Sequence, residues 1–158
     1  METPCPSPEF LGPSVSGWRP GDFLPAPAAG RVLSDVESWP EWTASVTSVR
    51  RLSSERLRVG SRVRIKQPGL PATVWTVSDL VEGEQFTWTA DSPGVRTRAS
   101  HRVAGRADGS QATLWIEQGG VLGSVVGLLY GGLTRRYLQM EAAGLKQRSE
   151  ESAAQQRV

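Results

Sequence analysis

GGVLGSVVGLLYGGLTRRYLQMEAAGLKQRSE, residues 119–150, is the stretch that decides the fold. No proline interrupts it, and large apolar side chains recur in it at steps of three and four. These are Leu122, Val126, Leu129, Leu133, Tyr137 and Met140. Because that spacing places side chains on one stripe of an α-helix, it predicts a single long helix with one apolar face.

The first half of this predicted helix is rich in glycine. The glycines are Gly119, Gly120, Gly123, Gly127, Gly131 and Gly132. Glycine costs a helix about 1 kcal/mol per position relative to alanine, so their number needs a reason. Small residues let a second backbone or a ligand come close. We therefore expect a helix that fills a curved sheet with its glycine-rich half beside a cavity. The alternative is a core helix whose glycines serve tight packing only.

The chain before this helix has the pattern of β-structure. Alternating or β-rich segments cover residues 44–52, 62–66, 72–81, 85–90, 95–104 and 110–118. Short turns join most of them, which favours antiparallel pairing. With short helices near residues 28–42, the order predicts an α+β fold in which about six strands wrap around the C-terminal helix. In residues 72–81 both faces are partly apolar, so the inner face stays open.

The two ends of the chain differ from the middle. Seven of the eleven prolines fall in the first 27 positions, which disfavours helices and central strands there. We expect residues 1–24 to form a poorly ordered arm or tail, residues 25–150 to form the domain, and residues 151–158 to form a frayed polar tail. Trp39 and Trp42, on either side of Pro40, are expected to cover one end of the core.

Composition restricts the classes of function. Lys and Arg total 18 against 16 Asp and Glu, so the charge balance gives little support for an acidic partner. The single cysteine, Cys5, offers neither a disulfide framework nor a cysteine metal site, and we expect no metal and no cofactor. No secretory signal is visible, and the apolar segment of residues 119–133 is shorter than a membrane span. We therefore expect a cytoplasmic protein with no integral membrane span.

A basic outer sheet face is also predicted. Its members are Arg62, Arg64, Lys66, Arg96, Arg98 and Arg102. A nucleic-acid-binding protein would use such a patch, but no RNA-binding aromatic pattern accompanies it. We interpret this surface as a solvated face and expect no nucleic-acid partner.

Four stretches together resemble a known superfamily. They are LSDVESWPEWTASV (residues 33–46), the hairpin from Trp75 to Trp88, SPGVRTRASHRV (residues 92–103) and the helix end EAAGLKQRSE. In this order they resemble the SRPBCC superfamily, and within it the polyketide cyclase/dehydrase and lipid-transport group, a relative of START domains. The resemblance covers roughly residues 25–150. It implies a helix-grip fold with an apolar cavity between the sheet and the C-terminal helix.

One feature departs from that family. Its members begin with a long strand before the first helix, whereas this chain has proline-rich sequence in that place. Either this edge strand is missing, or residues 15–24 supply a poor substitute for it. A missing strand would leave a sheet edge unpaired, and unpaired edges favour self-association. A homodimer through the open edge is therefore one expected assembly.

Candidate site residues follow from these patterns. His101 is the sole histidine, and it is read either as a general acid/base or ligand hydrogen-bond donor, or as a histidine bonded to a neighbour near a strand end. Asp79 is a candidate partner for it. Apolar and aromatic residues are expected to line a pocket for a flat or lipidic molecule, the alternative being an ordinary core. The predicted ligand-binding set is Trp75, Phe86, Trp88, Thr97, His101, Leu114, Val126, Leu129, Tyr130 and Leu133.

Three hypotheses about function result. The first is a small soluble protein that binds an apolar or aromatic small molecule or lipid. The second is a cyclase/dehydratase-type enzyme that uses the same cavity, with His101 and Asp79 or Tyr130 moving protons. The third is a subunit without a ligand that uses the open edge or the glycine-rich helix to bind a partner or a membrane surface. An acid/base pair converging in the cavity would favour the second over the first.

Overall fold

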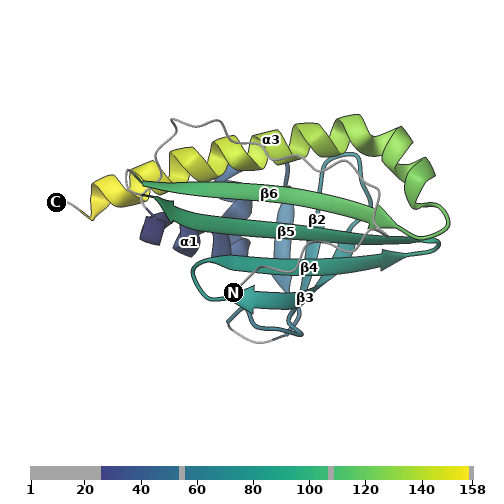
Figure 1. The fold of residues 1–158 in the computed structure, drawn as a ribbon, viewed down its shortest axis with the longest axis horizontal. Helices are drawn as coiled ribbons and strands as arrows, with labels where there is room; N and C mark the ends of the chain where they lie inside the picture. Colours follow the sequence, from purple (N-terminus) through teal and green to yellow (C-terminus); the bar gives the residue numbers. More distant parts are fainter. Residues whose placement is uncertain (1–25, 54–55, 107–108, 157–158) are drawn as a thin grey trace.

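A computed structural model describes residues 26–53, 56–106 and 109–156 of the chain. Two short helices and one turn of 3-10 helix come first, then six strands, then one long helix (Figure 1). The elements are α1 (Ala26–Ser34), η1 (Val36–Ser38), α2 (Trp39–Trp42), β1 (Ser48–Arg51), β2 (Arg62–Lys66), β3 (Thr73–Val81), β4 (Gln85–Ser92), β5 (Val95–Arg106), β6 (Gly109–Gly119) and α3 (Gly123–Gln155).

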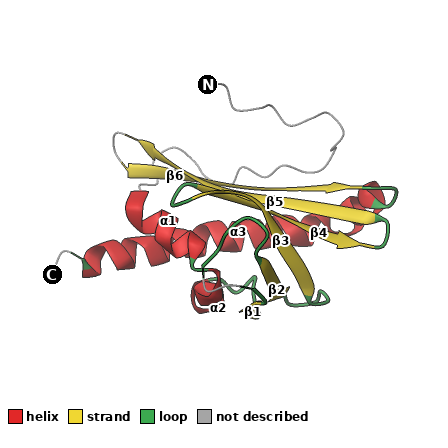
Figure 2. Cartoon of the chain, turned by 90° about the horizontal axis from the view of Figure 1, so that it is seen from below, coloured by secondary structure: helices red, strands yellow, loops and turns green. Residues whose placement is uncertain are grey.

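The strands form one antiparallel sheet in sequence order, β1 to β6. Tight turns make this order possible: Gly83 and Gly94 have φ of 76° and 75°, a conformation that costs glycine little. The sheet curves over α3, and the short helices lie on the same side as α3 (Figure 2). The predicted α+β class with a long C-terminal helix is confirmed.

A bulge in β3 explains why its pattern was ambiguous. Val77 pairs with Trp88 and Leu80 pairs with Phe86, so the register shifts between Val77 and Asp79. The extra residue changes the phase of the alternation, as β-bulges do. The face that carries Trp75 and Val77 is the inner one, and Val77 is buried.

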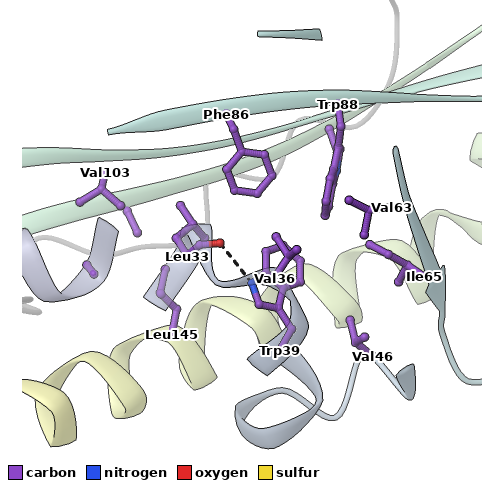
Figure 3. Close-up of a cluster of buried hydrophobic side chains, with 13 residues drawn as sticks. Leu33, Val36, Trp39, Val46, Val63, Ile65, Phe86, Trp88, Val103 and Leu145 are labelled. Carbon is purple, nitrogen blue, oxygen red and sulfur yellow. Dashed lines mark hydrogen bonds between the residues drawn. The ribbon is translucent and has the colours of Figure 1, made fainter. Parts of the chain in front are cut away.

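The main core lies where the short helices meet the sheet and the C-terminal part of α3. Trp39 is 1% exposed, and its ring lies among Leu33, Phe86 and Trp88 (Figure 3). Its Nε1 donates a hydrogen bond of 3.2 Å to the Leu33 carbonyl, which fixes the indole. Of the two tryptophans expected at this end of the core, Trp42 is only half-buried.

The long helix differs from the prediction at both ends. It begins at Gly123, because Gly120 adopts a φ of 95° and turns the chain out of β6. It continues to Gln155, so residues 151–155 are helical rather than frayed. Gln147 donates to Glu151 (3.1 Å), and Arg31 of α1 donates to Gln156 (3.2 Å), which ties this end to α1. The proline-rich residues 1–24, and with them the question of a strand before α1, lie outside the described residues.

The buried stripe of α3 is also displaced from the predicted one. Its members are Gly123, Tyr137, Leu138, Glu141, Ala142, Leu145 and Ser149. Leu129, placed in the predicted stripe, is 70% exposed. The predicted stripe mixes steps of three and four, whereas the side that meets the rest of the molecule follows Leu122, Val126, Tyr130 and Thr134 at successive steps of four, each of which advances about 40° around the helix. No helix in the described part of the chain has both the length and the apolar character of a membrane span.

Candidate functional site

A cavity of about 390 Å³ lies between the inner face of the sheet and α3. The floor of the cavity is formed by aromatic and small side chains of the sheet, which face inward because successive residues of a strand point to opposite faces. From the sheet, Trp75, Trp88, Ala90, Thr97, His101, Ile116 and Gln118 line it. From α3, the lining residues are Val126, Tyr130, Thr134, Tyr137, Leu138 and Glu141.

Two loops form the rim of this cavity. The β2–β3 loop contributes Gln67, Gly69, Leu70 and Pro71, and the β4–β5 turn contributes Ser92 and Pro93. The hydroxyl of Tyr137 donates to the carbonyl of Pro68, which attaches the first loop to α3. The backbone N–H of Leu122 donates to the Gly94 carbonyl over 2.9 Å, which attaches the second turn to the start of α3.

Tryptophan rings make one wall of the cavity. Trp75 and Trp88 lie with ring centroids 5.5 Å apart, and Trp88 lies 5.4 Å from Trp39. These tilted contacts suit aromatic quadrupoles and hold the rings in fixed orientations. A flat or apolar molecule would meet a preformed surface there.

His101 and Glu141 supply the polar end of the cavity. His101 is 3% exposed, and its ring stacks on Phe86 at 4.5 Å with an interplanar angle of 15°. Its Nε2 lies 3.7 Å from Oε2 of Glu141, close enough for an ion pair when the imidazole is protonated but too long for a good hydrogen bond. Oε1 of Glu141 accepts a hydrogen bond of 3.2 Å from Ser45 Oγ, which also bonds Thr43.

One nitrogen of His101 has no protein partner. Among the described residues, nothing bonds to the buried Nδ1. A buried polar group without a partner costs stability, so such groups need an explanation. Because His101 lines the cavity, a ligand group that hydrogen-bonds to Nδ1 is one explanation. The neutral ring carries one donor and one acceptor, and a carboxylate beside Nε2 favours the proton there.

Six of the predicted ligand-binding residues line the cavity, and four do not. The six are Trp75, Trp88, Thr97, His101, Val126 and Tyr130. Phe86 is buried beneath His101 in the main core, and Leu114 is buried against Leu138 and Ala142. Leu129 and Leu133 lie on α3 outside the lining because the helix presents the neighbouring side chains Val126, Tyr130 and Thr134 to the cavity.

Asp79 is not the partner of His101. It pairs with Thr87 on β4, whereas His101 pairs with Phe86, so the two side chains project from opposite faces of the sheet. Its Oδ2 accepts from Gln85 Nε2 at 3.3 Å. The bulge after Val77 puts Asp79 on the outer face.

Sequence reasoning missed Glu141 and Trp39 as site residues. Glu141 lies just beyond the predicted apolar stripe, which ends at Tyr137 and Met140. A signal for it was present: steps of four and three from Val126 through Tyr130, Thr134 and Tyr137 reach Glu141. Trp39 carried no such signal, because its position depends on how α2 folds back under the sheet.

The predicted basic face lies on the outer side of the sheet, away from the cavity. Arg96 pairs with Asp91 at 2.7 Å, and the guanidinium of Arg98 lies 5.4 Å from the centre of the Trp115 ring. Lys66 Nζ donates to the Leu70 carbonyl at the cavity rim. Among the described residues, no group of three His, Cys, Asp or Glu side chains could hold a metal ion.

The sequence was compared with protein families and with known proteins. The sequence profile of the family described as "Polyketide cyclase / dehydrase and lipid transport" matches residues 24–150. No curated protein matches the sequence.

Several solved structures share the fold at low sequence identity. The Zhui aromatase/cyclase from a Streptomyces species has a TM-score of 0.67 and 13% identity, over 91% of this chain and 94% of that one. A START superfamily protein from Mycobacterium smegmatis has a TM-score of 0.62 and 18% identity, over 90% and 97%. A hypothetical protein from Helicobacter pylori has a TM-score of 0.68 and 14% identity, over 89% and 86%. Identities this low show a shared fold only.

Proposed function

Because the chain belongs to the polyketide cyclase/dehydrase and lipid transport family, we propose that it binds an apolar or aromatic small molecule or lipid in the cavity between the sheet and α3. The cavity carries this proposal. Its volume of about 390 Å³ falls in the range of small-molecule sites. Its wall of Trp75 and Trp88 offers apolar surface, and burial of ligand surface there contributes roughly 25 cal/mol per Å² before the costs of association.

Polar groups at the inner end would orient the ligand. The unpartnered Nδ1 of His101 is suited to accept a hydrogen bond from a ligand hydroxyl. Thr97, Thr134 and Tyr130 add hydroxyl groups along the walls. The best ligand is therefore an elongated or flat apolar molecule with one hydroxyl or similar donor at the end that enters first.

Native mass spectrometry of the purified protein, followed by extraction and identification of bound molecules, tests this function. Titration with an apolar fluorescent dye gives a second readout. Val126→Trp places a large ring in the cavity and is expected to abolish binding. Leu129→Trp is the matched control, because Leu129 is on the same helix, outside the lining and 70% exposed. A protein that purifies empty and ignores the dye, or a control that fails as badly as Val126→Trp, contradicts the proposal.

A second candidate function is enzymatic, and the pairing of His101 with Glu141 favours it. In an intramolecular aldol cyclisation, His101 would take a proton from a carbon between two carbonyls. The carbanion would form a carbon–carbon bond to another carbonyl of the same chain, and the alkoxide would take the proton back. Loss of that hydroxyl with a neighbouring hydrogen releases water. Glu141 would stabilise the imidazolium between the two proton transfers.

His101→Gln separates the two candidates. Glutamine keeps a polar side chain of similar reach but cannot serve as the base. With a poly-β-ketone mimic, loss of water detected by mass spectrometry in the wild type and absent in His101→Gln would establish the enzyme. Unchanged dye affinity in the same variant would show that the cavity still forms. If neither protein converts the mimic, binding without chemistry remains the proposed function.

Assembly and location stay predictions. Size-exclusion chromatography with light scattering tests for a homodimer through the sheet edge. Microscopy of a fluorescent fusion in the host cell tests whether the protein is located in the cytoplasm.

A further inference from the structure

The first half of α3 is apolar on both of its sides. One side lines the cavity through Val126 and Tyr130. The other carries Val125, Leu128 and Leu129, which are 53%, 86% and 70% exposed, and Val121 just before the helix is 91% exposed. A helix that is apolar all round is normally buried on all sides. Here the outer side faces solvent.

These side chains form one patch rather than scattered single residues. Six large hydrophobic side chains between positions 121 and 130 are exposed, against three in the rest of the described chain: Leu52, Val59 and Val81. Val121, Val125 and Leu128 follow one another at steps of four and three, so they form a stripe. Contiguous exposed patches of this kind mark interaction sites, unlike isolated apolar residues. We call Val121, Val125, Leu128 and Leu129 the outer patch.

The charges around the outer patch have one sign. Between Glu117 and Glu141 the chain has no acidic residue, and its only charged residues there are Arg135 and Arg136. Both arginines are exposed and follow the patch by two turns of the helix. The acidic residue of β4, Asp91, is paired with Arg96. An apolar helix face with arginines beside it suits a bilayer that carries anionic lipid.

The outer patch also lies at the open end of the cavity. The turn that begins α3 is bonded to the β4–β5 turn, whose Ser92 and Pro93 belong to the cavity rim. Figure 1 shows this end of α3 at the tip of the sheet, away from α1 and the C-terminal end of the helix. A surface that covered the outer patch would therefore lie next to the mouth of the cavity.

We propose that the outer patch docks onto an anionic phospholipid bilayer, with Val125, Leu128 and Leu129 in the interface and Arg135 and Arg136 at the headgroups. The docking itself stands on the exposed patch and its charges. Its purpose rests on the proposed function: an apolar ligand passes between the membrane and the cavity without crossing water.

Co-sedimentation with vesicles tests the docking. The purified wild type is mixed with vesicles of phosphatidylcholine alone, or of equimolar phosphatidylcholine and phosphatidylglycerol. We expect binding to the anionic vesicles and little to the neutral ones. Leu128→Glu should reduce the bound fraction at least tenfold, because it puts a carboxylate into the interface. The double variant Arg135→Glu/Arg136→Glu should also bind the anionic vesicles more weakly than the wild type, and this loss should be larger in low salt than in high salt.

Val59→Glu is the matched control, because Val59 is 61% exposed and lies outside α3. It should bind vesicles like the wild type. Circular dichroism checks that each variant is folded, and dye titration without vesicles checks the cavity. Leu128 does not line the cavity, so Leu128→Glu should keep the wild-type dye affinity.

Three results would overturn the proposal. The wild type could ignore both kinds of vesicle, or Leu128→Glu could bind as well as the wild type. Alternatively, light scattering could show a wild-type dimer that Leu128→Glu converts to a monomer, with no vesicle binding, and the outer patch would then be a contact between two copies. Vesicle binding by a protein that binds no dye would leave the docking in place and remove the proposed function.

Discussion

At the scale of single residues, Glu141 is the most informative side chain in the chain. It is a buried carboxylate that accepts a hydrogen bond from one serine hydroxyl and lies beyond hydrogen-bond length from a histidine. Burying a carboxylate costs free energy that these contacts offset only in part. A group kept in that position despite its cost is suited to a role in the cavity.

Replacing Glu141 with leucine should therefore separate stability from function. We expect the free energy of unfolding to stay the same or rise, because leucine removes the cost of burying a carboxylate while Ser45 keeps its bond to Thr43. Ligand binding or turnover should fall. Urea denaturation and dye titration measure the two effects, with Glu150→Leu on the exposed side of α3 as the control. A loss of stability of about 3 kcal/mol or more would instead make Glu141 a structural residue.

Glu37 gives a second prediction, about pH. Arg51 donates to it from Nε (2.9 Å), Nη2 (2.6 Å) and its backbone N–H (3.2 Å), which joins η1 to β1. These hydrogen bonds from Arg51 lower the pKa of Glu37. Since the folded-state pKa is the lower one, the contribution to stability is present above the ordinary glutamate pKa and is lost as pH falls through the folded value.

Because the pair is partly exposed, that contribution should be below about 1 kcal/mol. Side-chain NMR titration should show Glu37 losing its charge at lower pH than exposed glutamates do. In Arg51→Met the pKa of Glu37 should move back up. Equal titration in the two proteins would argue against the assigned cause.

Single residues also show where sequence reasoning about the site succeeded and failed. Trp88 and His101 were placed on the cavity side because side chains alternate between the two faces of a strand with a period of two, whereas alternation left the face of Trp75 open. Leu129 and Leu133 were misplaced because an error of one position along a helix turns a side chain by a quarter of the circle. The His101–Glu141 contact joins β5 to α3, and nothing in either segment alone indicates it.

At the scale of elements, the strands were the easiest to predict and the ends of α3 the hardest. Strand β2 was predicted at its observed bounds, because Val63 and Ile65 alternate with charged residues. The segment of residues 44–52 shrank to the four residues of β1. Thr43 and Ser45 are buried instead; they hydrogen-bond each other, and Ser45 donates to Glu141. The helix extends beyond its predicted end because two contacts attach its polar last turns to other helices. Arg148 of α3 pairs with Glu41 of α2, and Arg31 of α1 donates to Gln156 at the end of α3.

Two glycines of α3 should respond oppositely to alanine. At Gly144 a methyl group would collide with the backbone carbonyl of Trp42, so α2 could not stay in place. We expect Gly144→Ala to cost roughly 1–3 kcal/mol despite alanine's higher helix propensity. At Gly132 nothing lies within 4 Å of the added carbon, so Gly132→Ala should gain about 0.5–1 kcal/mol. Thermal and urea unfolding measure both. A gain at Gly144 would mean that α2 yields easily.

At the scale of the whole molecule, the two halves of α3 have different surroundings: the C-terminal half packs in the core, and the N-terminal half borders the cavity. The C-terminal part of α3 meets α1, α2 and the sheet, and Leu145 and Ser149 there are fully buried. The N-terminal part borders the cavity, carries most of the glycines and exposes the outer patch. A rigid end thus holds a less constrained end in position beside the cavity mouth.

This division predicts a gradient of local stability along α3. Backbone amides of residues 125–134 should exchange hydrogen about tenfold or more faster than those of residues 137–149, because opening there exposes little additional apolar surface. Hydrogen–deuterium exchange with mass spectrometry resolves the two halves, and peptides from β4 and β5 serve as slow-exchanging references. A bound dye should slow exchange in residues 125–134, since Val126 and Tyr130 contact the cavity, and should leave residues 142–149 unchanged. Uniform protection along α3, with or without the dye, would mean that the helix opens as one unit. Ligand entry would then have to take place at the β2–β3 loop and the β4–β5 turn rather than by movement of the helix.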